Sequence, residues 1–108
     1  MAAFARISVP LEAKRGEPFE VRVSIRHAME TGYRVDEVGK SIPRNCVREI
    51  ACAYNGVEVF RAHTDSGIAA NPYLRFYVGA LASGELVLTW VDDAGERGEA
   101  RASVRVTA

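Results

Sequence analysis

The sequence predicts an all-β sandwich of about seven antiparallel strands, in one domain that spans residues 1–108. Three observations lead to this prediction. Apolar and polar residues alternate with the period of two that is typical of a strand with one buried face. Turn residues separate the alternating segments at short, regular intervals. No segment shows a convincing helical period, and the chain is 48% apolar, which is sufficient for one core.

The first half contains two predicted strands and one long polar connection. Residues 6–9 form a strand that Pro10 ends, and residues 19–26 form the clearest strand of the half. Its inward residues are Phe19, Val21, Val23 and Ile25. His27 follows on the core side as the strand ends. Residues 28–45 then lose the alternation and can include a short hairpin, and a connection of this length inside a small domain is usually functional or disordered.

The second half predicts five further strands. Residues 47–54 and 57–61 are joined by Asn55-Gly56, the pair favoured in a tight hairpin turn. After a loop over residues 63–71, a strand begins at Pro72. The last two strands cover residues 86–91, with Trp90 as a core anchor, and 97–106, and Asp92-Asp93-Ala94-Gly95 forms the turn between them. Seven strands in this spacing predict two packed sheets of the immunoglobulin-like type.

The charge balance and the absence of long apolar runs exclude two classes of function. Fourteen basic residues offset fourteen acidic ones, whereas a nucleic-acid-binding domain needs a basic face. No apolar run approaches the length of a membrane span. The N-terminal residues also lack the pattern of a signal peptide, so the chain by itself predicts a cytoplasmic location.

The two cysteines, Cys46 and Cys52, are six residues apart. On one strand they would lie about 20 Å from each other, which is too far for a disulfide bond. We expect two free thiols, with Cys52 in the core and Cys46 at the start of a strand and partly exposed. A thiol-redox function that uses Cys46 is therefore one alternative.

The sequence predicts no metal site, no cofactor and no catalytic residue. The candidate ligands are His27, His63, Cys46 and Cys52, and they lack the close paired spacing of a structural zinc site. The predicted architecture resembles that of iron enzymes such as superoxide reductase, but those enzymes need more histidines than this chain has. The pair Asp92-Asp93 is interpreted as a turn former rather than as an acid–base pair.

Two groups of residues have both a structural and a functional interpretation. His27 and Glu30 open the long connection, and a histidine at the end of a strand is commonly a hydrogen-bonded structural group. Met29 can cap the core or adapt to a binding partner. Tyr73, Arg75 and Tyr77 share one strand face and form either a solvated surface or an interface, since tyrosine and arginine are enriched in binding hot spots.

Several stretches taken together, in their order and spacing, resemble one known family. They are His27-Ala28-Met29-Glu30-Thr31-Gly32, Gly39-Lys40-Ser41-Ile42-Pro43-Arg44, Tyr54-Asn55-Gly56, Ala69-Ala70-Asn71-Pro72-Tyr73-Leu74, Phe76-Tyr77, and Ser83-Gly84 leading to Thr89-Trp90-Val91-Asp92-Asp93. This chain resembles SoxZ, the small subunit of the SoxYZ sulfur-carrier complex of thiosulfate oxidation, from about Ile7 to Thr107. Relatives tend to have proline where this chain has Ala28, and this difference affects the expected conformation of the connection.

The resemblance implies a non-catalytic subunit with a SoxY-like partner. That partner carries sulfur intermediates on a cysteine in a mobile C-terminal arm, and other periplasmic enzymes of the pathway act on them. The resemblance also implies a periplasmic location, reached by export together with the partner. The end of this chain has no cysteine arm, so we expect it to correspond to the supporting subunit and not to the carrier.

We expect partner contacts on the long connection and on one sheet face. The predicted interface residues are His27, Met29, Glu30, Tyr33, Arg34, Asn71, Tyr73, Arg75 and Tyr77. A self-associating or ligand-binding sandwich is the other alternative, because the same surface could pair two copies when the chain is isolated.

Overall fold

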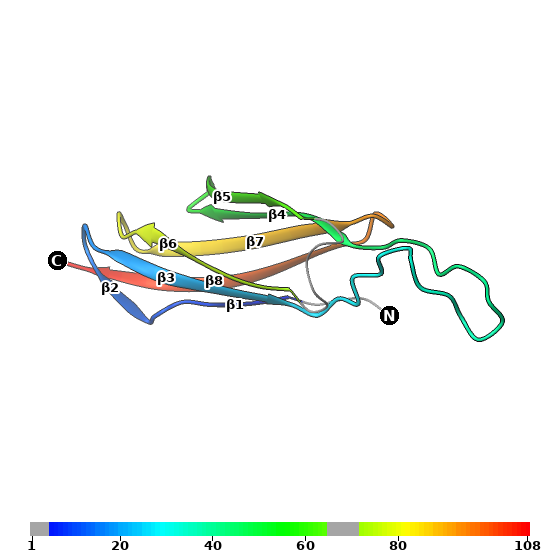
Figure 1. Cartoon of the computed structure of the whole chain (residues 1–108). Helices are drawn as coiled ribbons and strands as arrows, with labels where there is room; N and C mark the ends of the chain where they lie inside the picture. The colour runs from blue at the N-terminus through cyan, green and yellow to red at the C-terminus, as the bar shows by residue number, and fades with distance from the viewer. Residues whose placement is uncertain (1–4, 65–71) are drawn as a thin grey trace.

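The computed structural model describes residues 5–64 and 72–108, and it arranges eight β-strands in two packed sheets (Figure 1). The strands are β1 (Ala5–Ser8), β2 (Glu12–Lys14), β3 (Pro18–Ile25), β4 (Val47–Tyr54), β5 (Val57–His63), β6 (Tyr73–Gly79), β7 (Gly84–Asp92) and β8 (Arg97–Thr107). One sheet has the order β1-β3-β6 and the other β2-β8-β7-β4-β5. The prediction of an all-β sandwich is confirmed.

The short strand β2 was not predicted from the sequence, and it makes the larger sheet mixed rather than purely antiparallel. This three-residue strand pairs in parallel with β8, where Ala13 lies opposite Val106. Its sequence, Glu-Ala-Lys, is too short to show a period of two. Its pairing at the sheet edge comes from the chain path after Pro10, which returns the backbone to the end of β8.

The core lies between the two sheets and is built by the alternation seen in the sequence. The largest fully enclosed apolar side chains are Ile25, Ile50, Leu86, Leu88, Val21, Val23 and Val47. Phe60 of β5 stacks on Phe76 of β6 with ring centroids 4.1 Å apart. This contact joins the edge strands of the two sheets. Trp90 is buried, as predicted.

The molecule is elongated because the connection between β3 and β4 leaves the sandwich. The extents are 61 × 19 × 18 Å and the radius of gyration is 16.2 Å, whereas about 13 Å is typical of a compact chain of this length. Residues 28–45 project from one end of the sheets (Figure 1). None of the described residues forms a helix, so the described part of the chain contains no helical membrane span.

Candidate functional site

The projecting segment, residues 28–45, is called the arm here, and it is an antiparallel hairpin. At its base, Glu30 and Asn45 exchange both backbone hydrogen bonds, with N–O distances of 2.9 and 2.8 Å. Farther out, Ile42 donates its backbone N–H to the carbonyl of Arg34 at 2.9 Å. The long connection therefore contains a short hairpin, an option that its sequence had left open.

The tip of the arm is closed by hydrogen bonds to Asp36. Its carboxylate Oδ1 accepts from the backbone N–H groups of Val38 and Lys40, both at 3.0 Å. The Asp36 N–H donates to the Lys40 carbonyl at 2.8 Å, and Gly39 has the positive φ of 82° that closes the turn. These local bonds satisfy the backbone without help from the sandwich.

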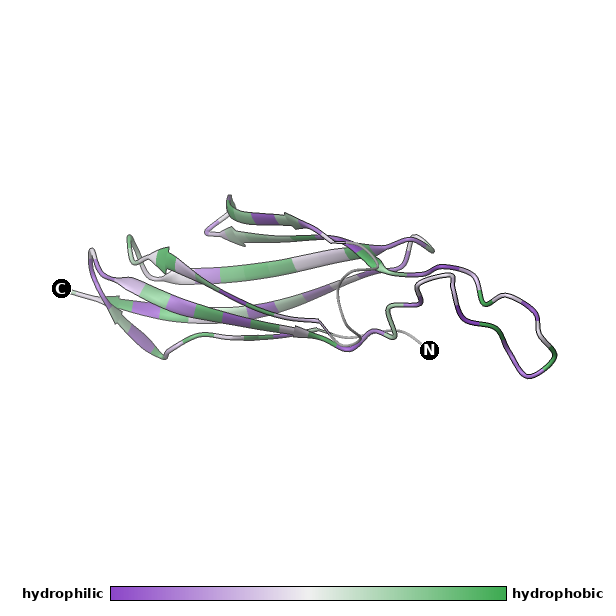
Figure 2. Ribbon diagram, viewed as in Figure 1, coloured by the Kyte–Doolittle hydropathy of each residue, from purple (hydrophilic) through white to green (hydrophobic). Residues whose placement is uncertain are grey.

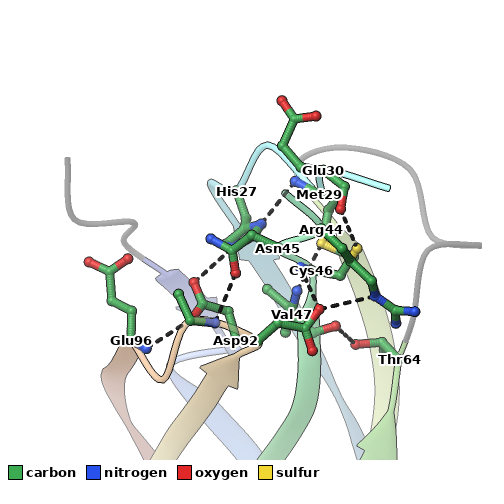
Figure 3. Close-up of polar contacts among 12 residues, drawn as sticks. His27, Met29, Glu30, Arg44, Asn45, Cys46, Val47, Thr64, Asp92 and Glu96 are labelled. Atoms are coloured by element: carbon green, nitrogen blue, oxygen red, sulfur yellow. Dashed lines mark hydrogen bonds and ion pairs between the residues drawn. The ribbon is translucent and has the colours of Figure 1, made fainter. Parts of the chain in front are cut away.

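The root of the arm is fastened to the sandwich through His27 (Figure 3). The Nδ1 atom of His27 accepts the N–H of Met29 at 2.9 Å, so this nitrogen carries no proton. Nε2 is then the protonated nitrogen, and it donates to Oδ2 of Asp92 at 3.0 Å. Met29 has a φ of 54°, unusual for a residue other than glycine, and its sulfur accepts the N–H of Val47 at 3.2 Å.

Asp92 is completely buried and has a structural role that its turn-forming sequence did not reveal. Besides its contact with His27, its Oδ1 accepts the N–H of Glu96 at 2.9 Å. The carboxylate thus connects the arm root to the turn between β7 and β8. A carboxylate with no exposure requires such partners, because burying an unpaired charge is costly.

The second side of the root is fastened by Asp93 and Asn45, and Figure 3 shows Asn45 beside Cys46. Oδ2 of Asp93 accepts the N–H of Cys46 at 3.0 Å and lies 3.2 Å from Nε of Arg44. The hydrogen bond from Cys46 and the nearby Arg44 lower the pKa of Asp93 below its usual value. The side-chain oxygen of Asn45 accepts from Ala94 at 3.1 Å. Both strands of the arm are therefore attached to the same turn.

Both cysteines are free and buried, and this corrects the prediction that Cys46 is partly exposed. Cys46 has no exposed surface, because its thiol lies inside the arm root and donates to the carbonyl of Glu30 at 3.2 Å. Burial raises the pKa of the Cys52 thiol to about 11. Neither sulfur is accessible to an external reagent in this arrangement.

The arm presents apolar side chains to solvent. Tyr33 is 88% exposed, Val38 is 86% exposed and Val35 is 59% exposed. Figure 2 shows hydrophobic residues interspersed with polar ones along the arm. Because the arm root is held at several points and its tip is closed, these side chains are presented on an ordered support.

The predicted interface residues fall into three groups in the structure. His27 and Met29 are buried at the root of the arm, where their hydrogen bonds hold it in place. Glu30, Tyr33 and Arg34 lie on the arm, where Tyr33 and Arg34 are exposed and Glu30 is half-buried, with its carboxylate 3.4 Å from Nε of Arg34. The remaining residues are Tyr73, Arg75 and Tyr77, exposed on the outer face of β6, and Asn71, which lies outside the described residues.

The described residues offer no group of three or more histidine, cysteine, aspartate or glutamate side chains that could hold a metal ion. Both ring nitrogens of His27 already have protein partners. His63 lies on β5 and is exposed, with its Nδ1 3.9 Å from the carboxylate of Glu49.

Comparisons with solved structures identify the architecture. The chain is similar to superoxide reductase (neelaredoxin) from Ignicoccus hospitalis, with 24% identity and a TM-score of 0.74 over 96% of this chain and 80% of that one. A putative superoxide reductase from Thermotoga maritima has 17% identity and a TM-score of 0.73, over 97% and 86% of the two chains. At these identities the similarity shows a shared fold only.

The sulfur carrier protein SoxY from Chlorobium limicola f thiosulfatophilum has the same fold. It is 14% identical, with a TM-score of 0.66 over 96% of this chain and 79% of that one. No curated protein matches the chain by sequence. A family model described as "Sulphur oxidation protein SoxZ" matches residues 7–103. This match covers nearly the whole chain and includes the arm and its root, and the chain therefore belongs to the SoxZ family.

Proposed function

We propose that this chain is a non-catalytic subunit that binds and positions a SoxY-like sulfur-carrier chain, and that the arm makes the principal contact. The observation that carries the proposal is the arm itself. It is an ordered hairpin with a fastened root, and it exposes Tyr33, Val35 and Val38. Exposed apolar side chains on a supported element are typical of an interaction site.

The burial of both thiols favours a structural role for this chain over a role in thiol chemistry. A carrier or redox cysteine must be reachable and must form a thiolate. Cys46 is enclosed in the arm root, and desolvation disfavours the thiolate of Cys52. In this proposal the sulfur intermediates are bound to a cysteine on the C-terminal arm of the partner. Export to the periplasm together with that partner is part of the same proposal.

The fold of the partner family is a further support. A solved SoxY has the same sandwich architecture as this chain. We infer that the complex pairs two related sandwiches and that the arm extends from one across the other. The length of the arm beyond the sheets gives it the reach for such a contact (Figure 1).

Self-association is a second candidate function, because a second copy could cover the same exposed arm residues. Sedimentation of the isolated chain at micromolar concentration distinguishes the possibilities. A concentration-dependent dimer that dissociates when the SoxY-type chain is added means that both partners use one surface. A dimer that persists in the presence of that chain argues against the arm as the site for the carrier subunit.

Co-expression with a SoxY-type chain tests the proposed function. We expect one complex of one-to-one composition on size exclusion. The variant Tyr33→Ser/Val38→Ser should weaken it, since it removes apolar area from the arm and leaves the arm backbone intact. Val57→Ser, at an exposed position on β5, is the matched control. Two separate peaks for the wild-type chains at micromolar concentration would contradict the proposal.

A further inference from the structure

The outer face of the three-stranded sheet is an ordered array of arginine and tyrosine side chains. The strand register aligns its outward residues in rows across β1, β3 and β6. One row holds Arg6, Ser24 and Tyr73, the next holds Ser8, Arg22 and Arg75, and the third pairs Glu20 with Tyr77. We call the set Arg6, Arg22, Tyr73, Arg75 and Tyr77 the arginine–tyrosine face.

The charge of this sheet differs from that of the other sheet. Strands β1, β3 and β6 contain three arginines and one glutamate, a formal charge of +2. The strands of the five-stranded sheet contain six basic and six acidic residues. The whole chain is neutral. The three-stranded sheet is therefore positive in a molecule whose net charge does not show it.

Glu20 organises the basic groups without neutralising them. Its carboxylate is bonded to Arg22, lies 3.8 Å from Nη1 of Arg75, and is 3.3 Å from the Tyr77 hydroxyl, which can donate to it. The hydrogen bond from Arg22 is the main reason that the pKa of Glu20 is lowered. One carboxylate is thus shared by two guanidinium groups and a phenol, which holds these side chains together and leaves positive charge in excess.

We propose that the arginine–tyrosine face is a second docking surface, separate from the arm, for a carboxylate-rich patch on the SoxY-like partner. Charge complementarity is the argument for this occupant: guanidinium groups bind carboxylates in paired geometry, and flanking tyrosines add contact area. Both tyrosines are more than half exposed, at 57% for Tyr73 and 65% for Tyr77. This inference rests on the proposed function.

The composition of the face favours an acidic protein over a nucleic acid. A duplex binder typically neutralises many phosphates with a dense array of lysine and arginine. Here the excess is two charges, and a glutamate lies at the centre of the array. A protein patch with a few carboxylates matches this number, and its contact should speed association at low salt.

The test measures affinity between this chain and the SoxY-type chain at about 50 mM and about 500 mM NaCl. We expect wild-type affinity to fall about tenfold over this range. Arg22→Glu/Arg75→Glu should bind at least about tenfold more weakly at low salt and should lose most of the salt dependence. Arg61→Glu/Arg101→Glu, at exposed positions on the other sheet, is the matched control and should stay within about twofold of wild type.

The design separates failure of this inference from failure of the proposed function. If the wild-type chain forms the complex and the SoxY-type chain binds both double variants with equal affinity, the docking surface alone is overturned. Arg22→Gln/Arg75→Gln, with folding checked by circular dichroism, repeats the test without placing new carboxylates beside Glu20. The absence of any wild-type complex overturns both the proposed function and this partner.

A second probe requires no complex. A hexaglutamate peptide titrated at low salt should shift the amide resonances of β3 and β6 in NMR spectra. Shifts that centre on Arg22 and Arg75 would support acid recognition by this face. Equal shifts on both sheets, or none, would overturn it.

Discussion

Nε2 of His27 lies 3.0 Å from Oδ2 of Asp92, and this buried contact fastens the arm to the turn between β7 and β8. The two residues are 65 positions apart in the sequence, and both side chains are almost fully enclosed. The other ring nitrogen, Nδ1, accepts the backbone N–H of Met29. One imidazole therefore orients the start of the arm and also donates a hydrogen bond to the buried carboxylate of Asp92. The geometry of the arm thus depends on a buried residue at its root.

Removal of His27 is the first prediction. His27→Ala leaves Oδ2 of the buried Asp92 carboxylate without its donor, so we expect a loss of about 3 kcal/mol in the free energy of unfolding. Urea denaturation at neutral pH measures this loss. His63→Ala is the control, because its side chain is 75% exposed, and it should change stability by less than about 0.5 kcal/mol. Equal stability of the two variants would contradict the assigned role of His27.

The pH dependence of stability is the second prediction, and it concerns Asp93. Its lowered pKa in the folded chain means that the carboxylate stabilises the fold above its unfolded pKa of about 3.9. This contribution is lost as the pH falls through the lower, folded pKa. The difference in urea midpoint between wild type and Asp93→Asn should be largest near neutral pH, should begin to shrink near pH ~4, and should disappear only below the folded pKa of Asp93.

The control for this pH series is Glu17→Gln, at an exposed position between β2 and β3. Its difference from wild type should stay small throughout. If Asp93→Asn destabilises the chain equally at neutral and strongly acidic pH, the contribution of Asp93 comes from its hydrogen-bond geometry and not from its negative charge, and the prediction is wrong.

The packing of Trp90 on Gly98 gives a third prediction. A Cβ atom added at Gly98 would lie 2.4 Å from Nε1 of Trp90. Gly98→Ala should therefore displace the indole and destabilise the chain by about 2 kcal/mol, with a shift in tryptophan fluorescence. Gly79→Ala is the matched strand variant, since an added Cβ has no neighbour within 4 Å there. Similar stability of both variants would argue against this packing.

Thiol reactivity is the fourth prediction. Cys46 has no exposed surface, and the pKa of Cys52 is raised to about 11, so neither should react with a maleimide in the folded chain near neutral pH. Both should react after denaturant is added. Mass spectrometry counts the labels. Rapid labelling of Cys46 in the folded protein would restore the thiol-redox alternative.

The sequence alone predicted most of the sandwich, because periodicity reports burial directly. The inward set of β3 and the outward set of β6 lie as their alternation indicated. Strand β2 was missed because three residues carry no period, and its position depends on a distant strand. The pattern therefore failed where tertiary contact, and not local sequence, decides the structure.

The candidate site was predicted only in part. Loss of alternation located the arm, and the core-side position of His27 indicated burial. The sequence did not reveal Asp92 as the partner of His27, because turn propensity explained that aspartate without any distant contact. The alternation of β3, extended two residues past Ile25, was the available sign that His27 is buried. Cys46 and Val47 are adjacent and both buried, which a period of two does not predict.

The central claim is that the arm contacts the SoxY-type partner, and a fluorophore at its tip tests this most directly. Val38→Cys provides a labelling site, because the two native thiols are buried. Leu81→Cys, in the turn between β6 and β7 at the opposite end of the sandwich from the arm, is the matched control (Figure 1). Binding of the partner should shift the emission of an environment-sensitive dye to shorter wavelength at position 38 and leave it unchanged at position 81. A complex that forms with no change at position 38 would contradict the account.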